Sequence, residues 1–212
     1  MKHSVLAVAF TSAVLTVLPS IAFGAAPNEI TFDLVPNPAF KGCLVKDPTM
    51  PASAKVIVTR TELNEVLLLE LNNIKPGLAF DLFTVQRSPF LADGSPDPNF
   101  KGNFGLAWYQ SDVQADSNGQ GEVVIKTILL DQIFGFDPTV ALLPTHTFHV
   151  GFWFNNPQDA AACGVDVTKP TPFNGEHKAG PLAMISLPVA PGLLGPLCAD
   201  PITTPSGVHC KP

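Results

Sequence analysis

The sequence is poor in basic residues and almost devoid of tyrosine. Its 212 residues include 12 lysines and arginines against 18 aspartates and glutamates, which gives a net charge of −6 at neutral pH. An acidic chain without a basic run is poorly suited to the phosphate backbone, so we expect no nucleic-acid partner. One tyrosine accompanies 15 phenylalanines, a balance typical of cores rather than of binding surfaces.

Short motifs of covalent or metal-dependent catalysis are also missing. The chain contains neither the G-x-S-x-G nucleophile turn nor the H-E-x-x-H zinc motif. No two cysteines stand at C-x-x-C spacing, which disfavours a structural zinc site. We therefore expect no catalytic residues and no cofactor, and we favour a non-enzymatic protein over an enzyme.

The one long apolar run lies at the N-terminus. Lys2 precedes an uncharged stretch over residues 4–18, and Pro19 and small residues up to Gly24 follow. This pattern predicts a secretory signal peptide over residues 1–24, and the run is shorter than the roughly 20 apolar residues of a transmembrane helix. We expect a secreted or periplasmic protein without a transmembrane segment, with a net charge of 11 − 18 = −7 after cleavage.

Four cysteines are present, at Cys43, Cys163, Cys198 and Cys210. An even number of cysteines in an exported chain predicts two disulfides, for which three pairings are possible. The short, proline-containing segment between Cys198 and Cys210 favours a local bridge between them. That bridge would leave Cys43 to pair with Cys163.

Short β-rich runs separated by turn residues dominate the chain. We expect six or seven strands, over residues 55–60, 66–71, 78–86, 104–113, 122–130, 145–154 and 182–187. One helical turn is expected at Pro157 to Ala162. Strands of this number and length predict an all-β sandwich of the immunoglobulin or fibronectin-III kind over residues 25–190. An irregular proline-rich tail, closed by a disulfide, should follow over residues 191–212.

Two loops contain oxygen ligands of the kind that calcium prefers. The candidates in the first loop are Asp112, Asp116, Asn118 and Glu122, and those in the second are Asp93, Asp97 and Asn99. The first spacing does not match an EF-hand, whereas Asn118-Gly119 suits a tight hairpin turn. Prolines throughout the second loop indicate a stiff, solvated segment. We therefore favour structural turns over calcium sites.

Five residues are candidates for binding: His149, Trp153, Asn174, Glu176 and His177. His149 and Trp153 share one face of the strand over 145–154. If the phenylalanines of that strand fill the core, Trp153 faces outward or into a groove and becomes the best candidate for a ligand contact. A half-buried structural tryptophan is the competing interpretation.

The other three candidates lie in the segment TPFNGEHKAG, residues 171–180. His149, Glu176 and His177 together could bind a metal ion, so the alternative hypothesis is a metal-binding extracytoplasmic protein or enzyme. We favour a structural loop whose polar groups bond the chain near Asn155 and Asn156, because a buried unpaired polar group costs about 1–3 kcal/mol.

Four stretches occur in a fixed order: FGLAWYQSD, DSNGQG, VGFWFNNPQDA with the following Cys-Gly, and TPFNGEHKAG. In this succession the chain resembles a group of secreted bacterial proteins that share a WFN…DA…C…TPF-GEH-AG run, over about residues 56–187. The resemblance implies a compact extracytoplasmic β domain and transfers no activity or catalytic residue. The Lys75-Pro-Gly77 turn is also similar to a loop of fibronectin-III-like sandwiches.

The leading hypothesis from these patterns is an exported non-enzymatic β-sandwich protein. Its partner would be a protein, a small molecule or a glycan, or the domain would support the cell envelope.

Overall fold

A computed structural model describes residues 29–60, 64–128, 135–137, 142–166, 168, 180–189, 194–198, 201–204 and 207–210. The predicted signal peptide and the candidates Asn174, Glu176 and His177 lie outside these residues. Among the helices of the described part, none is long and apolar enough to cross a membrane.

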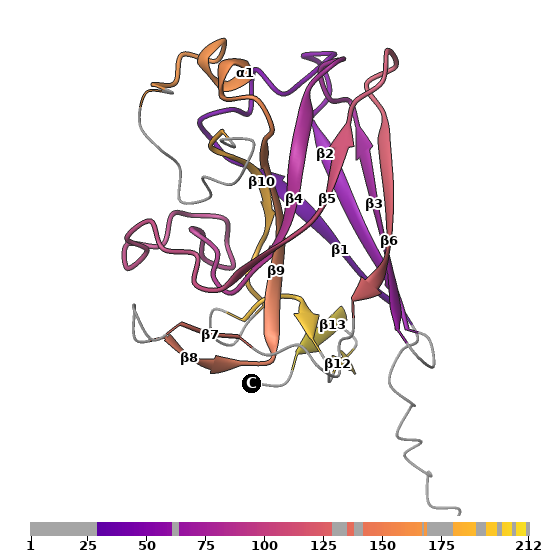
Figure 1. Ribbon diagram of the computed structural model, residues 1–212, viewed down its shortest axis with the longest axis vertical. Helices are drawn as coiled ribbons and strands as arrows, with labels where there is room; N and C mark the ends of the chain where they lie inside the picture. The colour runs from indigo at the N-terminus through magenta and orange to yellow at the C-terminus, as the bar shows by residue number, and fades with distance from the viewer. Residues whose placement is uncertain are drawn as a thin grey trace, which may run out of the picture.

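Nearly all regular structure is β (Figure 1). The described strands are β1 (Glu29–Pro36), β2 (Ser53–Thr59), β3 (Glu65–Asn72), β4 (Ala79–Val85), β5 (Ala107–Gln114), β6 (Gly121–Ile128), β7 (Gly135–Asp137), β8 (Leu142–Thr145), β9 (Thr147–Phe154), β10 (Leu182–Ser186), β11 (Leu197–Cys198), β12 (Pro201–Thr204) and β13 (Gly207–Cys210). The described helix is α1 (Pro157–Ala161). The all-β prediction is confirmed.

The main sheet is antiparallel and curls until its two end strands face each other, although the described residues show no pairing between them. Its strand order is β5-β4-β9-β10-β1-β2-β3-β6, and β11 adds to β9. The end strands β5 and β6 are joined by the turn over residues 115–120 and diverge from it, so the sheet forms an almost closed, barrel-like sandwich (Figure 1). Eight strands and β11 build this sheet rather than about seven, mainly because β1 was not predicted.

The sequence of β1 alternates between apolar and polar residues, as a strand with one buried face requires. Ile30 and Leu34 point inward and are buried, whereas Glu29, Thr31 and Asp33 are exposed. Strand β1 pairs with β2 on one side and with β10 on the other. It therefore links strands that are distant in sequence, and it was overlooked only because its polar residues interrupt the apolar run.

The interior of the sandwich is one hydrophobic cluster. Leu67, Leu69 and Leu71 contribute from β3, and Phe80 and Leu82 contribute from β4. The residues of each group alternate along their strand and so share one face, and all five side chains are completely or almost completely buried. Burial of such side chains is worth about 1.5–3 kcal/mol each before entropy is counted, so this cluster is the main stabilising feature of the fold.

A second, smaller cluster lies on the outer face of β4, β9 and β10. Its buried members are Val85, Phe90, Phe104, Trp153, Leu182 and Ile185. Residues 87–106 form a long loop over this face, and the loop supplies Phe90 and Phe104. The sheet is therefore covered on both sides here, which explains why every residue of β9 is buried.

One ion pair anchors the covering loop. Arg87 Nη2 lies 3.5 Å from Asp97 Oδ2, and the Asp97 side chain is fully buried. The guanidinium also lies over the Phe100 ring, 5.6 Å from its centroid, and Phe100 packs against Phe104. These contacts hold the loop against the outer face of the sheet.

A disulfide connects the segment after β1 to the segment after β9. It joins Cys43 and Cys163, whose Cα atoms are 5.7 Å apart, and it confirms the predicted pairing of these two cysteines. Cys198 is disulfide-bonded as well, and the side chain of Cys210 lies outside the described set. Disulfides persist in oxidising compartments, which is consistent with an extracytoplasmic protein.

Two local predictions near the C-terminal half have different outcomes. The helical turn is confirmed, since Pro157 opens α1 and the Asn156 side chain accepts from Gln158 N at 3.0 Å. The tail is more regular than expected: β11 extends the main sheet beside β9, and β12 and β13 form an antiparallel hairpin. Proline is compatible with the first position of β12, because the first residue of a strand can lack a backbone N–H donor.

Candidate functional site

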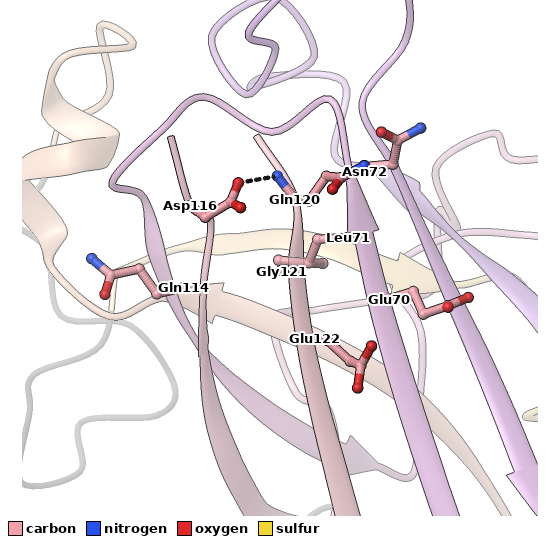
Figure 2. Close-up of a pocket in the computed structure, with 8 residues that line it drawn as sticks. All are labelled: Glu70, Leu71, Asn72, Gln114, Asp116, Gln120, Gly121 and Glu122. Atoms are coloured by element: carbon pink, nitrogen blue, oxygen red, sulfur yellow. Dashed lines mark hydrogen bonds between the residues drawn. The ribbon is translucent and has the colours of Figure 1, made fainter. Parts of the chain in front are cut away.

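An open groove of about 590 Å³ lies beside the β5–β6 turn. It is lined by Glu70, Leu71, Asn72, Gln114, Asp116, Gln120, Gly121 and Glu122, and we call it the polar groove. Figure 2 shows these side chains arriving from β3, from the end of β5 and from the start of β6. All the polar side chains are exposed and only Leu71 is buried, so hydrogen-bonding groups form more than half of the groove surface.

Two glutamates lie side by side on neighbouring strands of this groove. Glu70 and Glu122 are register partners on β3 and β6, side by side in Figure 2. Like charges directly opposite each other destabilise a sheet. Lys55 is the register partner of Glu70 on its other side, on β2, so no lysine or arginine lies between the two glutamates. The groove therefore presents concentrated negative charge.

Asp116 has a structural role in the turn that closes the groove. Its Oδ1 accepts from Gln120 N at 2.9 Å, drawn as the dashed line in Figure 2, and from Asn118 N at 2.8 Å. These bonds, first that from Gln120 and then those from Asn118, lower the pKa of Asp116. Its carboxylate thus stays ionised to lower pH and adds to the negative charge of the groove.

The hairpin interpretation of the first acidic loop agrees with the turn geometry. Gly119 has φ of 78°, the left-handed conformation for which the Asn-Gly pair was predicted. Its carbonyl accepts from Ile74 N at 2.9 Å, which docks the turn on the β3–β4 connection. Among the described residues, no group of three or more histidine, cysteine, aspartate or glutamate side chains could hold a metal ion.

The second acidic loop is held together by its own carboxylates. Asp93 Oδ1 accepts from Ser95 N at 2.9 Å and from Ser95 Oγ at 2.6 Å. Asp97 Oδ1 accepts from Asn99 N at 2.8 Å while Oδ2 faces Arg87. The loop is therefore built of structural turns, as favoured from the sequence, but it covers the sheet and buries Asp97 instead of being solvated throughout.

The side chain of His149 is buried and is not accessible from solvent. It is fully buried, and its Nδ1 lies 3.1 Å from the carbonyl oxygen and 3.2 Å from the Oγ of Ser186 on β10. The other two members of the predicted metal set, Glu176 and His177, fall outside the described residues, as does Asn174. The metal hypothesis thus stays a prediction.

Trp153 is a buried structural residue rather than an accessible ligand contact. The side chain does point away from Phe152 and Phe154, as the alternation requires, but only 1% of it is exposed. Phe83 and Phe104 pack edge-on against it, with ring centroids 5.3 and 5.2 Å away. The loop over residues 87–106 covers Trp153. The alternation along β9 predicts which face Trp153 occupies, but it does not predict that a loop from elsewhere in the chain covers that face.

A second acidic pair lies on the outer face of β4 and β5. Asp81 and Asp112 are register partners; Asp81 is buried and accepts from Asn155 Nδ2 at 2.7 Å. The Tyr109 hydroxyl donates to Asp112 Oδ1 at 3.0 Å. Burial, this hydrogen bond and the charges of Asp112 and Asp81 raise the pKa of Tyr109 to about 12, so the tyrosine remains a neutral donor.

Sequence reasoning missed the polar groove. Glu70 and Glu122 were not recognised as partners because they belong to strands that are not consecutive. The sequence signal that could have found them is that each glutamate lies on the polar face of an alternating strand sequence. That signal assigns a face to each residue, but only the β3–β6 register brings the two carboxylates together.

Comparison of the chain with protein-family models, with curated proteins and with solved structures finds no match. Function is therefore inferred from the geometry of the described residues.

Proposed function

We propose that this is an exported, non-enzymatic domain that binds a ligand carrying an ammonium group in the polar groove. The observation that supports the proposal is the direct opposition of Glu70 and Glu122 on β3 and β6. Their repulsion is an electrostatic cost that Lys55, the β2 partner of Glu70, offsets only in part. An ammonium group placed between the two carboxylates turns that cost into two attractive contacts.

The remaining lining specifies more than charge. Asn72, Gln114 and Gln120 add amide groups, each with donors and an acceptor. A ligand that combines an ammonium group with hydroxyl or secondary amine groups satisfies both parts of the groove. Amino-sugar oligomers and polyamines have this chemistry, and neutral apolar molecules do not.

Export is part of the proposal and rests on two features. The N-terminal pattern is that of a signal peptide, and the Cys43–Cys163 disulfide belongs to an oxidising compartment. An exported protein meets cationic glycans and polyamines outside the cytoplasm.

Titration calorimetry of the purified chain tests the groove. The ligands are a glucosamine oligomer, its fully N-acetylated counterpart and spermidine. We expect the glucosamine oligomer or spermidine to bind, the acetylated oligomer to bind much more weakly, and added salt to weaken binding by screening. Whichever cationic compound binds tighter separates the two ligand sources.

The matched variants are Glu122→Gln and Glu29→Gln. Both remove one exposed glutamate from the outer face of the sheet, but Glu29 lies on β1, outside the groove lining. Glu122→Gln should weaken binding about tenfold, which corresponds to roughly 1.4 kcal/mol, and Glu29→Gln should change little. Equal binding of the acetylated oligomer, or equal losses in the two variants, would refute the proposal.

A further inference from the structure

Strands β5 and β6 are the two ends of the main sheet. In the described part of the chain β5 pairs only with β4 and β6 only with β3. Near the turn, Asp116 N donates to Gln120 O at 2.7 Å, but no ladder continues along the strands. We call the two facing edges the seam. An unpaired edge presents a row of backbone donors and acceptors to any extended chain.

Exposed apolar side chains concentrate at the seam. Only four large hydrophobic side chains of the described residues are exposed, and three of them are on β5 and β6: Trp108 at 43%, Tyr109 at 51% and Val124 at 46%. The fourth, Met50, lies outside both strands. Apolar side chains beside an unpaired edge mark an interaction site more strongly than either feature alone.

A bulge in β5 directs one of these side chains inward. The β4–β5 register shifts between Leu82 and Phe83, so that Phe83 faces Tyr109 and Thr84 faces Trp108. Trp108 consequently stacks on Phe148 of the main core, with centroids 5.3 Å apart and planes at 26°. It is a core-side residue that is nevertheless exposed, which indicates that the sandwich is open at the seam.

The charges at the seam are mainly acidic. Asp112 on β5 and Glu122 on β6 are exposed, and Lys126 is the only basic residue of the two strands. A second copy of this chain, with its net charge of −6, would place like charges against these acids. A segment that is rich in lysine or arginine is complementary to them.

We propose that the seam binds an extended, basic segment of a partner protein, which adds to β5 or β6 as a further strand. Alternation in such a strand places one set of side chains, the apolar ones, toward Trp108 and the core. The other set, which includes the basic side chains, lies on the outer face, where Asp112 and Glu122 alternate with the exposed Tyr109 and Val124. This inference goes beyond the polar groove, because its binding groups are the strand edges and the exposed apolar side chains.

The probe is a synthetic nine-residue peptide that alternates lysine with valine, about the length of the edge strands. Its affinity for the full chain is measured by fluorescence anisotropy, and backbone amide exchange is followed by NMR. We expect binding, with new protection confined to amides of β5 and β6. Peptides with glutamate in place of lysine, or with prolines that remove the backbone donors, should bind at least tenfold more weakly.

Val124→Lys is the decisive variant, because lysine protects an edge strand and repels a basic peptide. It should weaken peptide binding at least tenfold. Met50→Lys adds the same charge at the exposed apolar position outside the seam and should have no comparable effect. Equal losses in the two variants, undiminished binding of the proline peptide, or protection elsewhere in the sheet would overturn the proposal. Self-association that the peptide does not displace would also overturn it, in favour of a second copy.

The proposal for the seam and the proposal for the polar groove can be tested independently of each other. Glu70 lies on β3, away from both strand edges. Glu70→Gln should therefore weaken binding of the ammonium ligand and leave the affinity for the peptide within about twofold. A peptide that fails to bind a chain with an intact groove refutes the seam alone.

Discussion

Strands β9 and β5 both pair with β4 and have opposite environments. Both are eight residues long, and both combine aromatic with polar residues. Every residue of β9 is buried, whereas β5 has Val113 as its one fully buried residue. β9 lies between two strands, with the main core inside and the loop over residues 87–106 outside, and β5 ends the sheet. Burial therefore depends on the neighbours of a strand as well as on its own residues.

The largest expected effect concerns the disulfide in the segment that follows β9. The Cys43–Cys163 bridge spans 120 residues, and in the chain-entropy model a loop of that length is worth about 5 kcal/mol. Cys43→Ser should lower the free energy of unfolding by about that amount, measured by urea denaturation. The predicted Cys198–Cys210 bridge closes a much shorter loop, so Cys210→Ser should cost only about 3 kcal/mol. Equal, negligible losses would contradict the pairing.

A matched pair of tryptophans tests the comparison of strands directly. Trp153→Ala removes a fully buried side chain from β9 and should cost about 3–5 kcal/mol. Trp108→Ala removes a partly exposed one from β5, whose stacking on Phe148 is worth about 1 kcal/mol. Urea denaturation of both variants measures the difference. Similar losses would mean that the seam is packed as tightly as the centre of the sheet.

The third prediction concerns the loop that covers β9. Asp97→Asn keeps the shape of the side chain but removes the buried charge that faces Arg87, and should cost about 1–3 kcal/mol. Trp153 emission should shift to longer wavelength in a Trp108→Phe background, because its cover loosens. Asp93→Asn, in the exposed part of the same loop, is the control. An unchanged emission in Asp97→Asn would show that the ion pair does not hold the loop.

The smallest effect is the acid sensitivity of the turns. Hydrogen bonds to neighbouring residues lower the pKa of four exposed aspartates below the ordinary value of 3.8: Asp47, Asp93, Asp116 and Asp166. A carboxyl group with a lowered pKa in the folded state stabilises the fold above pH 3.8. That contribution disappears as the pH falls below 3.8 and through the folded pKa.

Urea midpoints measured from about pH 6 down to pH 2.5 test this effect for one aspartate near β5 and one near β9. Asp116 holds the turn after β5 and Asp166 follows α1 beyond β9. Asn at either position keeps the turn acceptor but cannot titrate, so each variant should show a shallower loss of stability in acid. A variant that follows the parent chain throughout this range would show that its aspartate is unperturbed.

Local features of this protein follow from its sequence alone. Alternation identified the inward faces of β3 and β4, Asn118-Gly119 identified the turn after β5, and Pro157 identified the start of α1. Each depends on interactions within a few residues, where backbone sterics and hydrogen bonding leave few choices. The pairing of Cys43 with Cys163 was favoured in the same way, by the short spacing of the other two cysteines.

The environment of these elements was decided by the tertiary structure. Alternation assigned Trp153 to the face opposite Phe152, but the loop over residues 87–106 made that face a second core. Likewise, Glu70 and Glu122 are a site only because β6 closes against β3, and Trp108 is exposed only because β5 and β6 do not pair. The physical reason is that side-chain periodicity fixes a direction, whereas burial and charge opposition depend on which distant segment fills that direction.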